Sequence, residues 1–600
     1  MIKNFKIILR SLRGYKKYAI ITPIFMVFEA VLECLMPFVM GLFVNGIKQM
    51  IQPSDFFSTE ASNPAVFYLI LILVVMAIIS LLCGIFGGRT ASIASVGLAC
   101  NLRSDLYKKI ESFSFENIDH FTSSSLITRM TTDINNVQMA FQMMIRIVVR
   151  APLMLIFSTI MTFVSGGIMG LIFFGIIPLV AIGLALIIKN AMGIFIRVFK
   201  RYDKLNQSVQ ENVTGIRVVK SYVREDFEKD KFKTASDDIT FDFVKAEKIV
   251  ALNSPLLNTA IHMSNILIIG VGSYLIYRTG HWDGSDIVGG KLTVGQMSAL
   301  ITYGIQILMS LMMISMILVM MTMSVESSKR IVEVINEEPT IVNPENPIYE
   351  VVNGDVSFEN VNFKYKKDAE VNTLSNINID IKSGQFIGIL GSTGSGKTSV
   401  INLISRLYDA TEGSVKVSDH DVREYDLVSL RNAVSVVLQK NILFSGTIAS
   451  NLTWGDLNAT EEEMMQACRI AQAEEIVNAK PEGLQSRVEQ GGANFSGGQK
   501  QRLCIARAIL KKPKILILDD STSAVDTKTD RLIRKALKED LPHMTKIVIA
   551  QRISSIEDAD QIIILDNGMI NAIGTHEELL KSNKIYQEVY YTQNRVGGDK

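Results

Sequence analysis

The chain has 600 residues, of which 48% are hydrophobic, and its formal net charge at pH 7 is +1. This length is too great for one ordinary domain and predicts at least two. The balanced charge argues against a protein dedicated to nucleic acid, and the five scattered cysteines lack the spacing of a metal site or a disulfide framework.

The first seventeen residues carry six lysines and arginines among isoleucine and leucine. This pattern is typical of a basic amphipathic helix on the cytoplasmic face of a membrane, although a solvated run of charge has the same composition. We favour the membrane-bound helix because a long apolar stretch follows directly.

Six apolar stretches follow, each at or above the ~20 residues that a membrane-spanning helix needs. They centre near residues 18–47, 66–96, 140–164, 167–196, 248–277 and 296–323. The loop at 49–65 contains Asp55 and Glu60 but no lysine or arginine, whereas basic residues gather at the opposite ends of the stretches. By the positive-inside rule those basic ends and both termini are cytoplasmic, which predicts a multi-pass protein of the cytoplasmic membrane. The basic residues are Arg103, Lys108, Lys109, Lys189, Arg197, Lys200, Arg201, Lys204, Lys329 and Arg330.

Two polar segments, near 102–138 and 197–248, keep helical periodicity, so we expect the helices to continue into the cytoplasm. Each segment is expected to contain a short transverse piece, around 116–121 and 213–222.

The chain is therefore divided into three parts. Residues 1–335 are predicted to form an all-α transmembrane domain of six spanning helices with long cytoplasmic extensions. Residues 336–353 form a polar linker with three prolines, which break helix. From 354 to 600 short β-branched strands alternate with helices, which predicts an α/β nucleotide-binding domain.

Charged residues also occur inside the predicted spans. Such residues usually pair with one another or face a cavity, so they either fix contacts between helices or bind a cationic substrate. They are Glu29, Glu33, Arg146 and Arg150. The last span has methionines on one helix face, which suits either varied apolar ligands or ordinary packing. They are Met309, Met313, Met316, Met320 and Met323.

A glycine-rich segment matches the phosphate-loop pattern G-x-x-x-x-G-K-[ST]. It lies between an apolar run at 386–390 and a helix-forming segment at 399–404, which is the strand–loop–helix context that the pattern requires. We expect its backbone N–H groups to cradle the phosphates of ATP. Lys397 is expected to reach the β- and γ-phosphates, and Thr398 to bind Mg²⁺. The other loop residues are Gly391, Ser392, Thr393, Gly394, Ser395 and Gly396.

Two further residues fit an ATP site. Asp519 ends the apolar run at 515–518, in the position of a carboxylate beside Mg²⁺. Tyr365 precedes the loop by 26 residues and is placed to stack on adenine, although a tyrosine in such a strand equally serves packing.

Several segments resemble motifs of ATP-binding cassette (ABC) proteins. Phe495-Ser496-Gly497-Gly498-Gln499 is similar to the family's L-S-G-G-Q signature, with Phe in place of Leu. Gln439 resembles the Q-loop glutamine, which implies a contact with Mg²⁺, and residues 523–526, ending in Asp526, resemble the D-loop. The resemblance covers the whole chain, because six spans followed by one cassette is the layout of an exporter half-transporter. It implies that two cassettes sandwich two ATP molecules, each between one phosphate loop and the other subunit's signature.

The chain departs from the family pattern at two positions that take part in ATP hydrolysis. The acid after the Mg²⁺ ligand is normally Glu and is here Asp520, and the switch-loop histidine is replaced by Gln551. Asp is one methylene shorter than Glu, and a displacement of about 1 Å can cost ~10²-fold in rate. A glutamine amide donates a hydrogen bond but does not carry a proton as histidine does.

These departures predict a degenerate ATP site beside an intact signature, and therefore a heterodimer with a homologous half-transporter that supplies a complete site. The expected function is ATP-driven export of amphipathic small molecules or lipids, with ATP and Mg²⁺ as cofactors, membrane lipid as a partner and no role for nucleic acid. A regulatory or channel-like ABC protein, or a peptide exporter, is the alternative, whereas the apolar spans exclude a soluble ABC ATPase.

Overall fold

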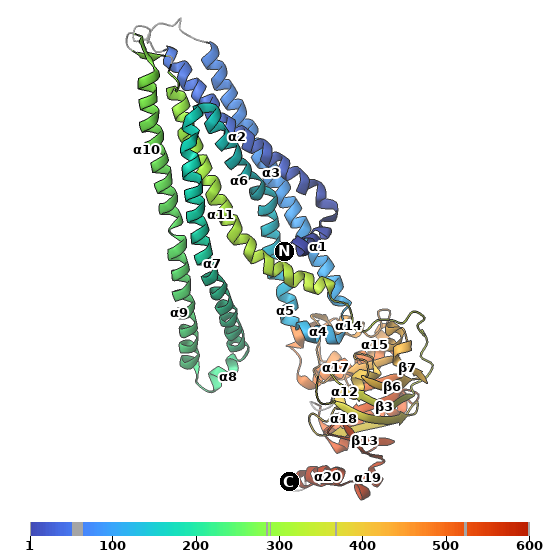
Figure 1. Cartoon of the computed structure of the whole chain (residues 1–600). Coiled ribbons are helices and arrows are strands. Elements are labelled where there is room, and N and C mark those ends of the chain that lie inside the picture. The colour runs from blue at the N-terminus through green and yellow to red at the C-terminus, as the bar shows by residue number, and fades with distance from the viewer. Residues whose placement is uncertain are drawn as a thin grey trace. The chain divides into compact units, whose positions relative to one another are not determined.

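In a computed structural model of the chain, residues 2–50, 64–283, 286–288, 290–366, 369–520 and 525–597 are described. They belong to two compact units. The first, Met1–Glu111 with Ser123–Glu337, is almost entirely helical, and the second, Ser112–Thr122 with Glu338–Lys600, is α/β (Figure 1). Asp55 and Glu60 of the predicted acidic loop lie outside the described residues, as do Ser523 and Ala524 of the predicted D-loop.

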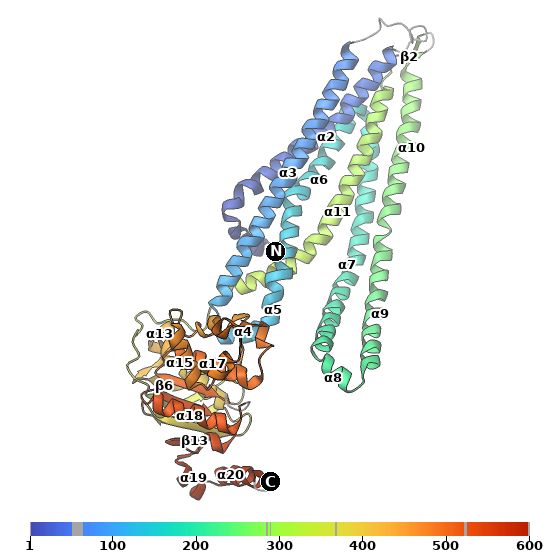
Figure 2. The same cartoon turned by 180° about the vertical axis from the view of Figure 1, so that it is seen from behind.

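Long helices make up the first unit. They are α2 (Lys16–Met50), α3 (Pro64–Glu111), α6 (Ile134–Gly166), α7 (Leu171–Thr214), α9 (Glu225–Val250), α10 (Asn253–Thr279) and α11 (Val294–Asn336). Shorter elements are α1 (Ile2–Ile8), η1 (Leu9–Tyr15), α5 (Ser123–Thr128), η2 (Arg129–Asp133), η3 (Gly167–Gly170), α8 (Ile216–Ser221), β1 (His281–Asp283) and β2 (Asp286–Val288). Helices α7, α9 and α10 run side by side, as both views show (Figures 1 and 2).

Five helical segments among the described residues are long and apolar enough to cross a membrane. One of them, Ser123–Val198, contains both α6 and α7, which are separated only by the turn η3. This accounts for the predicted stretches 140–164 and 167–196, so the segments agree with the six predicted spans. The predicted stretch at 248–277 differs in detail, because α9 ends at Val250 and α10 begins at Asn253. Pro255 lies in the first turn of α10 and has no N–H to bond the preceding turn, which favours a helix break just before it.

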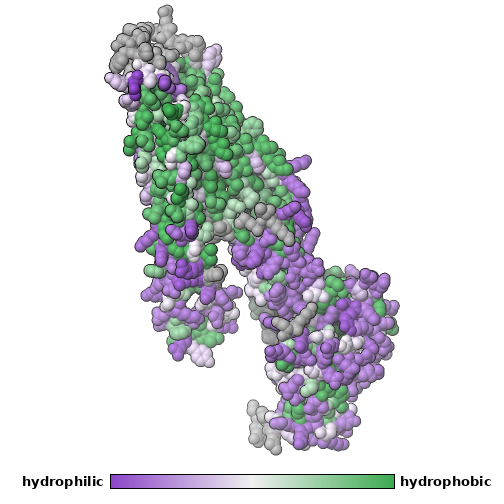
Figure 3. Space-filling view, viewed as in Figure 1, coloured by the Kyte–Doolittle hydropathy of each residue, from purple (hydrophilic) through white to green (hydrophobic). Residues whose placement is uncertain are grey.

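The surface of the first unit is suited to lipid. Leu71, Ile78, Leu81 and Ile85 of α3 are all exposed, although apolar side chains of this size are normally buried in water-soluble domains. Figure 3 shows an apolar band over these helices, with hydrophilic helix ends below it.

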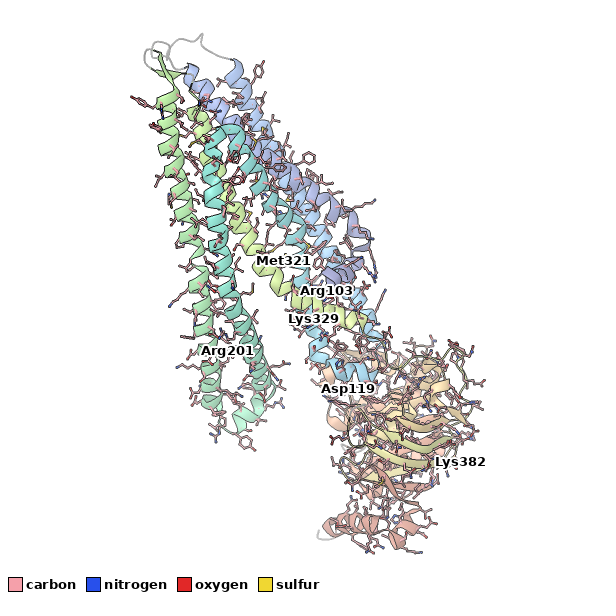
Figure 4. The ribbon with its side chains drawn as sticks, in the orientation of Figure 1. Arg103, Asp119, Arg201, Met321, Lys329 and Lys382 are labelled. Atoms are coloured by element: carbon pink, nitrogen blue, oxygen red, sulfur yellow. The ribbon has the colours of Figure 1, made fainter. Side chains whose placement is uncertain are left out.

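Three of the basic residues used for orientation lie at those hydrophilic ends (Figure 4). Arg103 is on the lower part of α3, Arg201 on α7 and Lys329 on α11 (Figure 4). All three are therefore outside the apolar band and on one side of it, as expected for the cytoplasmic ends of the helices.

The second unit is built on two sheets. The larger has the order β14-β13-β5-β12-β11-β8, with only β14 antiparallel, and the smaller, antiparallel sheet has the order β4-β3-β6-β7. The strands are β3 (Val356–Phe363), β4 (Leu374–Ile381), β5 (Phe386–Gly391), β6 (Glu412–Val417), β7 (His420–Asp421), β8 (Val434–Val437), β9 (Gly446–Thr447), β10 (Arg487–Val488), β11 (Ile515–Asp519), β12 (Thr545–Ile549), β13 (Gln561–Asp566) and β14 (Met569–Gly574).

Helices flank these sheets. They are α4 (Phe115–Phe121), α12 (Lys397–Ile404), α13 (Leu427–Ala433), α14 (Ile448–Leu452), α15 (Glu461–Ile470), α16 (Glu474–Asn478), α17 (Gly497–Leu510), α18 (Thr527–Asp540), α19 (His576–Ser582) and α20 (Lys584–Gly597). Short 3₁₀ turns are η4 (Val422–Glu424), η5 (Gly483–Gln485), η6 (Gln490–Gly492) and η7 (Ile553–Ser555).

The central strands are apolar on both faces because both faces are covered. In β5, Phe386 and Leu390 belong to one apolar core, whereas Ile387 and Ile389 belong to the other. Successive strand residues point to opposite faces, so an uninterrupted apolar run is what a doubly covered parallel strand requires.

The segment Ser112–Thr122 packs with the α/β unit although the sequence places it within the helical region. Its helix α4 is held by the Tyr408 hydroxyl, which donates to Asp119 Oδ2 at 2.5 Å. The ring of Phe115 also lies 6.3 Å from that of Tyr408. The predicted transverse pieces at 116–121 and 213–222 therefore correspond to α4 and α8.

Candidate nucleotide-binding site

Parallel strands bring together residues that lie far apart in the sequence. The neighbouring strands β5, β12 and β11 end at Gly391, Ile549 and Asp519, and β8 is next to β11. The carboxyl ends of parallel strands open at one edge of a sheet, which is where ligands bind in folds of this kind. Asp519 is the last residue of β11, and Asp520, Gln551 and the phosphate loop follow these strands, as Gln439 follows β8.

The phosphate loop has the backbone that its glycines permit. Gly394 and Gly396 have φ of +85° and +96°, values that other residues rarely adopt. A Cβ on Gly396 would also lie 2.5 Å from Leu374 Cδ2. Helix α12 begins directly after Gly396, so its N-terminal N–H groups face the loop.

The polar groups of this loop fit a magnesium–nucleotide. Lys397 Nζ lies 2.8 Å from Gly391 O and 2.7 Å from Ser392 O, within the loop where phosphate oxygens are expected. The Ser395 hydroxyl is buried and has no hydrogen-bond partner among the described residues, so it is available for a ligand oxygen. Thr398 Oγ1 lies 3.2 Å from Asp519 Oδ2, and these are the oxygen ligands that Mg²⁺ prefers. Bound there, Mg²⁺ would neutralise phosphate charge.

Asp520 is in contact with two glutamine amides. Gln551 Nε2 donates to Asp520 Oδ2 at 3.0 Å, and Gln439 Nε2 lies 3.4 Å from the same oxygen. Asp520 has a positive φ of 47°, a left-handed backbone conformation that is uncommon for residues other than glycine. The structure thus brings three predicted site residues into one hydrogen-bonded group.

Burial shifts the pKa values of the charged groups at this edge. It raises the pKa of both Asp519 and Asp520 above the usual aspartate value and lowers the pKa of Lys397. The hydrogen bond from Thr398 and the charge of Lys397 oppose the shift at Asp519 but do not cancel it. A cation beside Asp519 would favour its ionised form, as expected for a metal ligand.

Tyr365 lies next to the helix that follows the loop. Its hydroxyl is 3.0 Å from Ser399 Oγ on α12, and its ring meets those of Phe363 and Tyr408 edge-on. About 38% of the residue is exposed, so part of its side chain is accessible to a base while the rest is packed. Stacking on adenine and packing are therefore compatible roles.

The remaining predicted residues cap other helices. Ser496 is the N-cap of α17, where it exchanges hydrogen bonds with Gln499, and Gly497 and Gly498 form the first turn. Asp526 is the N-cap of α18 and accepts from the Thr529 N–H at 3.0 Å. The N-terminus of α17, which Ser496 caps, is exposed and therefore suited to contact the phosphate of an ATP molecule bound elsewhere than at this chain's own phosphate loop.

Sequence reasoning did not identify Tyr408 or Gln593. Tyr408 links the ring of Tyr365 to Asp119, and Gln593 bonds the backbone of Gln551 and Ile553. Neither lies in a recognisable motif, and both contacts join segments that are remote along the chain. Only the three-dimensional arrangement identifies them.

Family models match two regions of this chain. Residues 19–312 match the model described as ABC transporter transmembrane region, and residues 374–523 match the model described as ABC transporter.

Relatives match over most of their length. An ABC transporter ATP-binding protein of Mycobacterium tuberculosis is 35% identical over 528 residues, covering 87% of this chain and 88% of the relative. The ABC transporter ATP-binding protein YfiB of Bacillus subtilis is 32% identical over 587 residues, 98% of each chain. A solved structure of a bacterial Atm1-family ABC exporter with ATP bound superposes with a TM-score of 0.78, covering 96% of this chain and 98% of that one. At 22% identity this last likeness shows a shared fold.

Proposed function

Because the chain belongs to the ABC transporter family, we propose that it is one half of a heterodimeric exporter of amphipathic small molecules or lipids. ATP-driven transport by a membrane-spanning protein follows from the family. The proposal adds a partner subunit, a degenerate ATP site in this chain, outward transport and an amphipathic substrate. It also places both termini and the cassette on the cytoplasmic side of the cell membrane.

The contact between Gln551 and Asp520 carries the proposal. The two residues occupy the positions where the resemblance calls for histidine and glutamate, and they bond to each other at 3.0 Å. The shorter carboxylate is a poorer general base for water when both amides bind its Oδ2, because that oxygen is less free to accept a proton. We infer that this site binds ATP and hydrolyses it slowly.

Two exposed apolar surfaces support a partner subunit. The first is the turn around α8, where Val218, Tyr222, Val223 and Phe227 are exposed. The second is a groove of about 450 Å³ in the α/β unit, whose lining includes Ile442, Phe444 and Trp454.

Exposed apolar surface of this kind marks interaction sites. We propose that α8 of each subunit occupies this groove on the other. The intact signature at Ser496 would then complete the partner's ATP site.

The charged residues within the spans support an amphipathic substrate. Arg150 lies 2.7 Å from Glu33 and 3.4 Å from Glu29, so one arginine faces two carboxylates. Glu29 Oε2 is buried without a hydrogen-bond partner among the described residues, and Arg146, which lies near Gly88 of α3, attracts Glu29 more weakly than Arg150 does.

Pairing is thus one role of these charges, and the Glu29 oxygen that accepts no hydrogen bond favours a cationic group on the substrate. Apolar contacts are available from exposed methionines on α11. Those with described side chains are Met309, Met312, Met313, Met316 and Met320.

The test is to purify this chain alone and together with a homologous half-transporter subunit of the same organism, and to reconstitute each preparation in liposomes. We expect slow phosphate release from the single chain and fast release and dye transport from the pair. Rapid turnover by the single chain would contradict the degenerate site. Dye movement that only follows its gradient, without ATP hydrolysis, would instead identify the channel-like alternative.

A further inference from the structure

We propose that Gln593 on α20 is a positioning residue for the switch loop, defined here as Ala550–Ile553. The side-chain amide of Gln593 bridges two backbone groups of this loop. Its Nε2 donates to Gln551 O at 2.8 Å, and its Oε1 accepts from the Ile553 N–H at 2.9 Å. The inference rests on the proposed function in one respect, namely that Gln551 faces bound nucleotide.

Helix α20 is anchored so that Gln593 must face this loop. Tyr586, in the first half of α20, is fully buried, and its hydroxyl lies 2.7 Å from His576 Nδ1 of α19. Gln587 Nε2 also donates to Leu580 O at 2.8 Å. Gln593 is seven residues after Tyr586, and residues seven apart share one face of a helix. The face that buries Tyr586 therefore also presents Gln593.

The segment after the switch loop is held by different contacts. Arg534 of α18 donates to Ser554 O at 2.8 Å, and the Ser555 hydroxyl donates to Asp530 Oδ2 at 2.9 Å. Asp530, Arg534 and Ser555 are buried, so this network is part of the folded core. Gln593 is instead exposed, and its replacement should leave that core intact.

Gln551 is consequently fixed at both ends. Its backbone carbonyl accepts from Gln593, while its side-chain amide donates to Asp520. A loop that is ordered before its ligand arrives loses less conformational freedom on binding. Nucleotide affinity at this site should therefore depend on residue 593, although that residue lies in no nucleotide motif.

The test measures binding of radiolabelled MgATP to the full-length chain and amide hydrogen exchange across the switch loop. We expect Gln593→Ala to raise the Kd for MgATP about fivefold, the effect of losing about one uncharged hydrogen bond. Exchange at the Ile553 N–H should speed up, with no change around Asp530. Glu588→Ala, an exposed position on the same helix, is the matched control and should leave both readouts unchanged.

A second variant separates the two bonds. Gln593→Glu keeps an acceptor for the Ile553 N–H but has no donor for Gln551 O when ionised. It should restore slow exchange at Ile553 while leaving the Kd for MgATP raised. A wild-type Kd in Gln593→Ala, with or without faster exchange, would overturn the inference. If the wild-type chain itself bound no MgATP, the proposed function would be wrong and the inference would fall with it.

Discussion

Gln551 Nε2 lies 3.0 Å from Asp520 Oδ2, so the two residues that depart from the family pattern form one hydrogen bond with each other. They follow the ends of the adjacent strands β12 and β11, so both lie at the edge of the sheet where the phosphate loop also begins. Each residue therefore sets the surroundings of the other, and restoring one without the other leaves a mismatched pair. This relationship leads to the first prediction.

Replacing both residues should restore more activity than the two single changes together. Asp520→Glu alone lengthens the carboxylate, but Gln551 remains unable to carry a proton or a charge. Gln551→His alone leaves the carboxylate short. The double variant should be more than additive because both groups act on one transition state. The measurement is phosphate release from a heterodimer whose partner has its catalytic Glu changed to Gln. An additive result would place the defect elsewhere, first in the partner's signature.

Lys397→Ala should weaken ATP binding at this site while the heterodimer retains measurable turnover. The lysine supplies positive charge to the phosphates, whereas the partner's site keeps its own lysine. Lys382→Ala is the control, since Lys382 is an exposed residue of the same unit paired with Asp380 at 3.0 Å (Figure 4). Unchanged heterodimer turnover and binding in Lys397→Ala would mean that this site does not contribute to the cycle.

Ser496→Ala should reduce turnover of the heterodimer on the order of tenfold or more, because Ser496 is proposed to complete the partner's site. The change also removes a helix N-cap, which by itself costs about 1 kcal/mol of stability. Thr460→Ala removes a similar N-cap from α15 and serves as the matched control. Equal loss of activity in both variants would show that Ser496 acts only through folding.

Tyr408→Phe should loosen α4 from the α/β unit. The change removes the hydroxyl that bonds Asp119 and leaves the ring contacts in place, at a cost of about 1–2 kcal/mol. Hydrogen exchange in residues 113–121 should accelerate. Tyr425→Phe, which loses a bond to Val417 O at 2.8 Å, should destabilise the unit without a selective effect on α4. Unaltered exchange at α4 in Tyr408→Phe would show that apolar contacts alone hold it.

Asp519→Asn should stabilise the chain at neutral pH while abolishing Mg²⁺-dependent ATP binding. Burial raises the pKa of Asp519, so the folded state holds its proton more tightly than the unfolded state. Wild-type stability is therefore lost as pH rises from the ordinary aspartate pKa through the raised value, and the asparagine variant escapes this loss. Thermal midpoints should differ most at neutral pH and converge in acid. A variant less stable than wild type at every pH would contradict this origin of the shift.

The amino-acid sequence by itself determined the parts of this protein that depend on local pattern. The spacing of Gly391 to Thr398 and the apolar runs before Lys397 and Asp519 were enough to predict a phosphate loop and a metal-binding carboxylate. Apolar length predicted the spans, and the fold agrees with them. The replacements at Asp520 and Gln551 could also be recognised from the sequence, because each lies within a short motif.

The tertiary structure decided which of these parts meet. The order β5-β12-β11-β8 is a set of non-local pairings, and it is this order that places Gln551 and Gln439 on the same oxygen of Asp520. Two other contacts also join segments that are remote along the chain. Asp119 and Tyr408 are 289 residues apart, and Gln593 is 42 residues from Gln551 and 40 from Ile553. Local periodicity specifies which face of an element is apolar, but not which distant polar side chain will satisfy a given backbone group. That choice is made only when the elements pack.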